Sequence, residues 1–92
     1  MAAERRRVTY RGRVQGVGFR QTCCHIAKSH AVTGYVQNKS DGSVELVAEG
    51  DLPDIDGFLG YVRTDRRDFI RSEDVCCEPP AETQDLDFSI RY

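Results

Sequence analysis

The chain has 92 residues, of which 39% are hydrophobic and 30% are charged, and its formal net charge is −2. This length supports a single domain, residues 1–92, with one modest core, and it excludes two domains. No apolar run is long enough to span a membrane, and the basic start MAAERRRVTY lacks the apolar stretch of a secretory signal. We therefore expect a cytoplasmic protein with no membrane contact.

Alternation of polar and apolar residues predicts a strand over residues 7–14, and apolar residues at helical spacing predict a helix over residues 19–30. Residues 32–37 have the pattern of a second strand. The sequence NKSDG at residues 38–42 has turn chemistry, and residues 43–48 alternate as a third strand. The second and third strands should therefore form a β-hairpin.

A second helix should begin at Pro53, because proline suits the first turn of a helix, and should end near Arg66. A strand over residues 69–78, a loop over residues 79–85 and a final strand over residues 86–92 complete the chain. This order of elements predicts an α+β fold of the ferredoxin-like, or split βαβ, type. Its expected form is one antiparallel sheet of four to five strands with two helices on one face.

Charge is distributed unevenly along the chain. Residues 1–20 hold six arginines and one glutamate, whereas residues 21–92 hold seven basic and fourteen acidic residues. A positive segment on an acidic body indicates an anionic partner near the N-terminal strand. For residues 5–7 we expect solvated charges at a sheet edge, whereas Arg20 is a candidate ligand for an anion.

The four cysteines form two adjacent pairs, Cys23 with Cys24 and Cys76 with Cys77. Adjacent cysteines rarely bridge each other and no C-x-x-C motif is present, so we expect four reduced thiols. A zinc site built from both pairs and a histidine is a weaker alternative, because structural zinc ligands are usually separated by about two to four residues. We expect no metal.

The stretch GRVQGVGFRQ, residues 12–21, joins the first strand to the first helix. Its glycines allow successive backbone N–H groups to turn toward an anion, and the start of the helix adds the positive end of its dipole. Arg20 lies at this point and can bind two phosphate oxygens at once. The pattern is neither a P-loop nor a dinucleotide fingerprint, so loop chemistry alone leaves phosphate binding and a structural turn as equal alternatives.

Three longer strings are more specific than this loop. GRVQGVGFR at residues 12–20, TGYVQNKSDGSVE at residues 33–45 and the ending FSIRY at residues 88–92 closely resemble the acylphosphatase family. The resemblance covers essentially the whole chain. It implies hydrolysis of the carboxyl–phosphate bond of small acyl phosphates, such as carbamoyl phosphate or acetyl phosphate, to a carboxylate and inorganic phosphate without a metal or another cofactor.

The resemblance also implies roles for individual residues. Arg20 matches the family's phosphate-binding arginine, and Asn38 matches the asparagine that orients the attacking water. An amide can aim a water but is too weak a base to deprotonate it, which suits a substrate with a good leaving group. The implied phosphate-binding loop, which acts through its backbone amides and the arginine, consists of Gln15, Gly16, Val17, Gly18, Phe19 and Arg20.

Other functions are compatible with the fold. RNA-recognition modules share its topology, but the aromatic string with which they stack bases is absent and most of the chain is acidic, so no nucleic-acid partner is expected. A non-catalytic module that binds phosphate or an acyl phosphate is the main alternative, and a carbamoyl-phosphate-processing domain of a larger enzyme is a related one. We expect a monomer, because no additional apolar face needs a partner.

Overall fold

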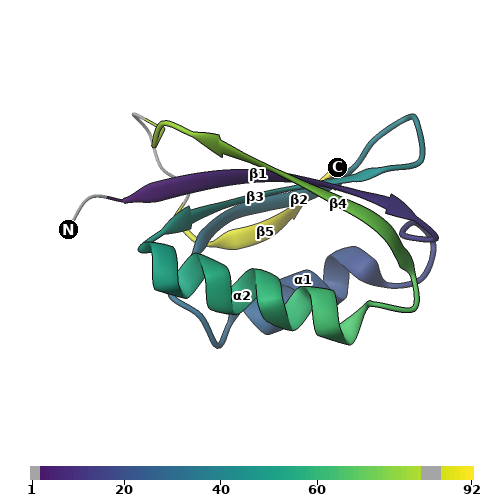
Figure 1. Ribbon diagram of the computed structural model, residues 1–92, viewed down its shortest axis with the longest axis horizontal. Coiled ribbons are helices and arrows are strands. Elements are labelled where there is room, and N and C mark those ends of the chain that lie inside the picture. The colour runs from purple at the N-terminus through teal and green to yellow at the C-terminus, as the bar shows by residue number, and fades with distance from the viewer. Residues whose placement is uncertain (1–2, 82–85) are drawn as a thin grey trace.

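The computed structural model describes residues 3–81 and 86–92. These residues form β1 (Glu4–Gly12), α1 (Phe19–Ala27), β2 (Thr33–Asn38), β3 (Val44–Gly50), α2 (Leu52–Asp65), β4 (Ile70–Glu78) and β5 (Phe88–Arg91). One sheet holds all five strands, and both helices cover the same face of it (Figure 1). The predicted ferredoxin-like α+β fold is confirmed. Neither helix of the described residues is long and apolar enough to cross a membrane.

The strands lie in the order β4-β1-β3-β2-β5, and the sheet is mixed rather than wholly antiparallel. The pairs of β1 with β4, of β1 with β3 and of β2 with β3 are antiparallel, whereas β5 pairs with β2 in parallel, with Gly34 opposite Phe88. The chain leaves β4 at one edge and begins β5 at the other, so no hairpin turn fixes the direction of β5. The parallel pairing of β5 shows that the expectation of one wholly antiparallel sheet was wrong.

Strand direction determines where the ends of the strands meet. β3 is antiparallel to both β1 and β2, so these two strands run the same way, and β5 follows β2. The last residues of the three strands, Gly12, Asn38 and Arg91, therefore lie at one end of the sheet. The loop of residues 13–18, here called the β1–α1 loop, leaves from this end (Figure 1).

The core lies between the sheet and the two helices. Val8 and Tyr10 on β1 are opposite Leu46 and Val44 on β3, and all four are buried because alternate residues of a strand face the same side. The helices contribute the side chains that recur at helical spacing on one face. The buried helix residues are Phe19, Cys23 and Ala27 on α1 and Ile55, Phe58, Leu59 and Val62 on α2.

Residues 5–7 do not lie at a sheet edge, contrary to our expectation. β1 runs between β4 and β3, so its arginines can reach carboxylates on both neighbours. Arg5 pairs with Glu49 at 3.2 Å, and Arg7 pairs with Glu45 at 2.8 Å. Glu78 on β4 pairs with both arginines, and hydrogen bonds from Arg7 and then Arg5 lower the pKa of its carboxyl group. The chain itself supplies the anionic partners of these arginines.

Predicted boundaries were wrong in several elements, among them α1, β1 and β5. α1 ends at Ala27 because the backbone N–H groups that follow donate to the carbonyl three residues back and not four, as in a 3₁₀ turn. Ser29 N, for example, donates to Ile26 O at 3.0 Å. The first strand begins at Glu4 and ends at Gly12, where its pairing with β4 shifts register. The last strand begins at Phe88, and Leu86 before it is 99% exposed.

Gly34 on β2 should be essential for the stability of the sheet. Its φ is +138°, and a Cβ atom at this position would overlap the carbonyl group of Val47 on β3. We expect Gly34→Ala to lower the free energy of unfolding by more than about 3 kcal/mol, measured by urea denaturation.

Gly60→Ala is the matched control for this substitution. Apart from the nearby backbone of α2 itself, no atom of the described residues lies within 4 Å of a Cβ added at Gly60. Gly60 is inside α2, so alanine should raise the free energy of unfolding by up to about 1 kcal/mol. Equal effects of the two substitutions would contradict the explanation given for Gly34.

Candidate active site

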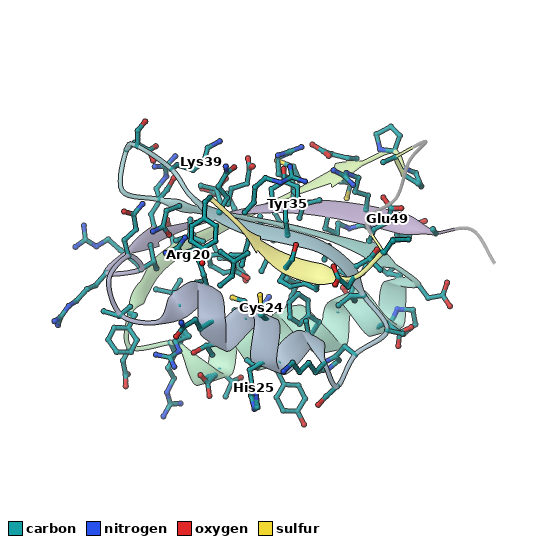
Figure 2. All side chains as sticks on the ribbon, turned by 180° about the vertical axis from the view of Figure 1, so that it is seen from behind. Arg20, Cys24, His25, Tyr35, Lys39 and Glu49 are labelled. Carbon is teal, nitrogen blue, oxygen red and sulfur yellow. The ribbon has the colours of Figure 1, made fainter. Side chains whose placement is uncertain are left out.

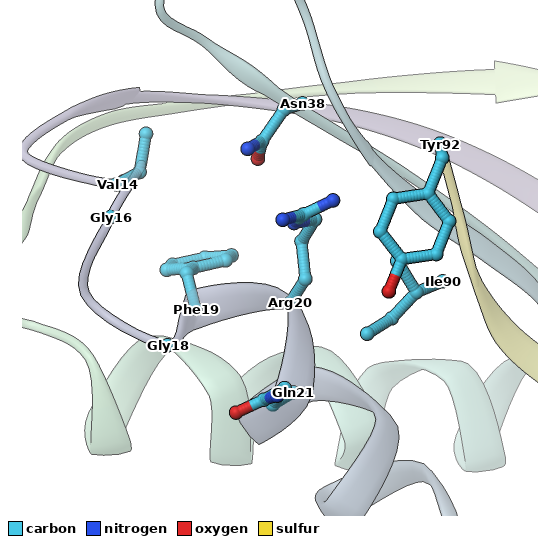
Figure 3. A pocket seen from close by; sticks show the side chains of 9 residues that line it. All are labelled: Val14, Gly16, Gly18, Phe19, Arg20, Gln21, Asn38, Ile90 and Tyr92. Carbon is cyan, nitrogen blue, oxygen red and sulfur yellow. The ribbon is translucent and has the colours of Figure 1, made fainter.

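A cavity of about 230 Å³ opens at the end of the sheet where β1, β2 and β5 finish. Its wall comes from the β1–α1 loop, the first turn of α1, the last residue of β2 and the end of β5, as Figure 3 shows. Arg20 and Asn38, which are 18 positions apart in the sequence, both face this space. The lining residues are Val14, Gly16, Gly18, Phe19, Arg20, Gln21, Asn38, Ile90 and Tyr92.

The β1–α1 loop depends on two glycines. Gly16 and Gly18 both have φ of +76°, in the left-handed region that strains other residues. In the described part of the chain, no atom beyond the neighbouring residues lies within 4 Å of a Cβ added at either position, so the requirement is conformational rather than steric. Gly18 immediately precedes α1 and offers no side chain to cap it. The first N–H groups of the helix are therefore open to an anion.

The Arg20 side chain points into the cavity (Figure 3). Its guanidinium carbon lies 5.2 Å from the centre of the Tyr92 ring, which is within the range of a cation–π contact. In the described parts of the chain, no carboxylate forms an ion pair with Arg20. In contrast with Arg5 and Arg7, this arginine keeps its charge available for an anion from outside.

The Asn38 amide points into the same cavity from the end of β2 (Figure 3). Its Oδ1 atom is buried, and within residues 3–81 and 86–92 it has no hydrogen-bond partner. A buried acceptor without a partner costs about 1–3 kcal/mol, so such an atom usually serves a ligand or an ordered water. The backbone of Asn38 is fixed in the sheet opposite Val44. This amide oxygen is therefore a preoriented acceptor facing the cavity.

Two of the six predicted loop residues do not line the cavity. The Gln15 side chain turns away and donates from Nε2 to Lys39 O at 2.8 Å and to Ser43 O at 2.9 Å, across the turn that follows Asn38. Val17 packs against the hydrophobic core. Any contact that these two residues make with a ligand must come from their backbone.

Sequence reasoning missed four residues of the cavity: Val14, Gln21, Ile90 and Tyr92. Val14 was assigned to the strand, although it lies in the loop after β1. The alternation in FSIRY did predict a strand, but no local signal indicated that this strand pairs in parallel with β2. That pairing brings Ile90 and Tyr92 beside Arg20.

The cysteines lie apart from the cavity, and all four are free. Cys23 is in the core and Cys24 is partly buried on α1, and burial raises the pKa of both thiols. Cys76 and Cys77 are exposed on β4. Among the described residues, no three His, Cys, Asp or Glu side chains are grouped so that they could hold a metal ion. The zinc alternative therefore gains no support.

The fold and the cavity define a small α+β protein with an anion-compatible pocket at one end of its sheet, and comparison with known proteins identifies its family. The acylphosphatase family model matches residues 6–90. The chain is 37% identical to an acylphosphatase of Oceanobacillus iheyensis over 87 residues, which cover 94% of this chain and 96% of that protein. The chain therefore belongs to the acylphosphatase family, enzymes that hydrolyse acyl phosphates, as the sequence resemblance implied.

Solved structures agree with this assignment. The crystal structure of acylphosphatase from Bacillus subtilis superposes with a TM-score of 0.84 and 31% identity, and the match covers 97% of this chain and 99% of that one. Full-length HypF in its phosphate- and nucleotide-bound form superposes with a TM-score of 0.82 and 27% identity, over 98% of this chain but only 12% of HypF. The same fold thus also occurs as a small part of a larger protein.

The turn that follows Asn38 should make stability depend on pH. Hydrogen bonds from the Ser43 hydroxyl and backbone N–H, and then from Arg11, hold the pKa of Asp41 at about 2. An unfolded aspartate has a pKa of about 3.9, so the unfolded state takes up protons first as the pH falls. The stabilisation from Asp41 is complete above about pH 4 and is lost as the pH approaches about 2.

We expect Asp41→Asn to lower the free energy of unfolding at pH 7, and we expect the gap between variant and native chain to close as the pH falls from about 4 to about 2. Urea denaturation at a series of pH values measures both effects. A gap that stays constant over this range would show that the Asp41 carboxylate does not stabilise the turn.

Proposed function

We propose that residues 1–92 act as a single-domain, metal-independent acylphosphatase with its active site in this cavity. In this proposal Arg20 and the backbone amides of residues 15–19 bind the phosphoryl group, and Asn38 orients the attacking water. The observation that carries it concerns residues 3–81 and 86–92: one cavity holds an arginine that pairs with none of their carboxylates and a buried amide oxygen to which none of them donates a hydrogen bond.

The positive side of the cavity suits the charge that develops in phosphoryl transfer. Negative charge spreads over the equatorial phosphoryl oxygens in the transition state, so fixed donors around them lower the barrier. Arg20 can hold two of these oxygens with its planar guanidinium, and the N–H groups of the loop and of the first turn of α1 can donate to the others. Because these donors are already in place, little reorganisation is needed during the reaction.

Asn38 supplies direction rather than basicity. Its Oδ1 accepts a hydrogen bond from a water and aims the oxygen of that water at phosphorus. A bond forms between this oxygen and phosphorus, and the bond from phosphorus to the acyl oxygen breaks with its electron pair leaving on the carboxylate. The proton lost by the water passes to the phosphate product or to solvent.

The size of the cavity and the surface of the protein support a small substrate and a monomer. A volume of about 230 Å³ is below the range of about 300–1,000 Å³ that is usual for drug-sized ligands, so it fits a small acyl phosphate. Among the described residues, the large exposed apolar side chains lie on α2, on β4 and on either side of β5. These side chains are Leu52, Tyr61, Val75, Leu86 and Tyr92.

We also propose that the protein is cytoplasmic and acts on no nucleic acid.

Hydrolysis of a synthetic aryl acyl phosphate in the presence of EDTA tests the proposal. We expect the native chain to turn over. Arg20→Ala should lower kcat/KM by about 10²- to 10³-fold or more, because it removes the charge that binds the phosphoryl group. Asn38→Ala should lower kcat by a similar factor with little change in KM, because the water is used only in the chemical step.

Gln37→Ala is the control, because Gln37 precedes Asn38 on β2 but faces the other side of the sheet, where it donates a long, exposed hydrogen bond of 3.5 Å to the Tyr92 carbonyl. It should keep most of the activity, and circular dichroism should show every variant folded. A folded native chain that is inactive, yet melts at a higher temperature in inorganic phosphate, would instead support the non-catalytic phosphate-binding module.

A further inference from the structure

We propose that Arg66, the residue that follows α2, is a positioning residue for the β1–α1 loop. Arg66 is not among the residues that line the cavity, and its side chain reaches the Val17 carbonyl of the loop from the end of α2. The inference rests on the proposed function, because it assumes that the amides of this loop bind the phosphoryl group. It assigns a role in that site to a residue that never meets the substrate.

The Arg66 guanidinium contacts the loop and the helix that follows it. Nη2 donates to the Thr22 hydroxyl on α1 at 2.6 Å, and Nη1 donates to the Val17 carbonyl in the middle of the loop at 3.4 Å. The guanidinium carbon also lies 5.5 Å from the centre of the Phe69 ring. The side chain is 22% exposed. The short bond to Thr22 and the aromatic ring together fix the direction in which the guanidinium faces Val17.

The contact with Val17 determines where the next N–H group points. In a trans peptide unit the carbonyl and the following N–H point in opposite directions. The Val17 carbonyl faces Arg66, so the N–H of Gly18 is turned away from Arg66, and Gly18 lines the cavity. Glycine gives this peptide unit more rotational freedom than any other residue would. Arg66 therefore holds the Gly18 N–H in one orientation, which the glycine by itself would leave free to rotate.

Charge adds to this geometric effect. A charged donor on a carbonyl oxygen polarises the peptide unit and makes the N–H on its other side a stronger donor. The carboxylate of Asp65 lies 3.1 Å from Arg66 Nε, but it is 50% exposed, so water screens it and it offsets the charge only in part. Arg66 thus strengthens the loop amides without occupying the space that the phosphoryl group needs.

The turn that begins at Arg66 also holds the start of the loop. Arg13 N donates to Phe69 O at 2.8 Å, and Phe69 N donates to Arg66 O at 2.9 Å. Backbone bonds therefore fix where the loop begins, and the Arg66 side chain fixes its middle. The two attachments come from the same short turn between α2 and β4.

The test measures the dissociation constant of inorganic phosphate by calorimetry and the amide signal of Gly18 by NMR. Arg66→Met removes both hydrogen bonds and the charge. We expect it to raise the dissociation constant roughly tenfold, because a misplacement of binding groups by about 1 Å can cost as much as about 10²-fold. The shift of the Gly18 amide signal on adding phosphate should also become smaller. Arg67→Met is the matched control, because Arg67 is exposed and adjacent, and it should leave both readouts unchanged.

Two more variants separate positioning from folding. Thr22→Val removes the bond that orients Arg66 and should weaken phosphate binding less than Arg66→Met does. Because Thr22 acts through Arg66, the double variant should bind phosphate as Arg66→Met does. Arg66→Lys keeps the positive charge but loses the planar guanidinium with its two donor groups. Its dissociation constant for phosphate should lie between those of the native chain and Arg66→Met.

A lower melting temperature of Arg66→Met with an unchanged dissociation constant would overturn the inference, as would equal weakening by Arg67→Met. Activity separates this failure from failure of the proposed function. If the native chain hydrolyses the acyl phosphate and Arg20→Ala does not, unchanged phosphate binding in Arg66→Met refutes the role of Arg66 alone. If the native chain is inactive but Arg66→Met still weakens phosphate binding, the role of Arg66 stands and the proposed catalysis fails.

Discussion

The site depends on the double pairing of β3. Because β3 is antiparallel to both β1 and β2, β1 and β2 run in the same direction and finish at the same end of the sheet. One strand end delivers the loop that leads to Arg20, and the other delivers Asn38. β5 joins this set only because it pairs in parallel with β2, and it adds the apolar wall of the cavity. Segments from the start, the middle and the end of the described chain thus meet at one end of the sheet.

The chain uses its arginines in two different ways. Both helices of the described chain cover one face of the sheet, and the other face carries Tyr35 and Glu49, which point away from the helices in Figure 2. Ion pairs between β1 and its neighbours cover this open face, and the Arg91 guanidinium carbon lies 3.7 Å from the centre of the Tyr35 ring. Arg20, on the side of the cavity, has no such carboxylate among the described residues. Local surroundings, and not the number of charges, decide which arginine can take an external anion.

The sequence was sufficient for the elements that local patterns determine and insufficient for those that distant pairing determines. Alternation and helical spacing predicted every element, and the glycines of residues 12–18 indicated that the chain turns between β1 and α1. The edge assigned to residues 5–7 was wrong because strand order is set by the whole sheet. Ile90 and Tyr92 were missed because nothing local encodes parallel pairing. The contacts of Arg66 escaped for the same reason, since Val17 lies 49 positions away.

The pairing of β1 with β4 has a consequence for how the protein folds. Arg5 lies opposite Glu78, 73 positions along the chain, so this pairing must close a very long loop before it stabilises anything. Proteins dominated by such distant pairings have a high relative contact order and fold slowly. The cavity needs β5 as well, so it is complete only when strands from both halves of the chain have found their places. Recovery of activity during refolding would therefore follow the last steps of sheet assembly and not the formation of the helices.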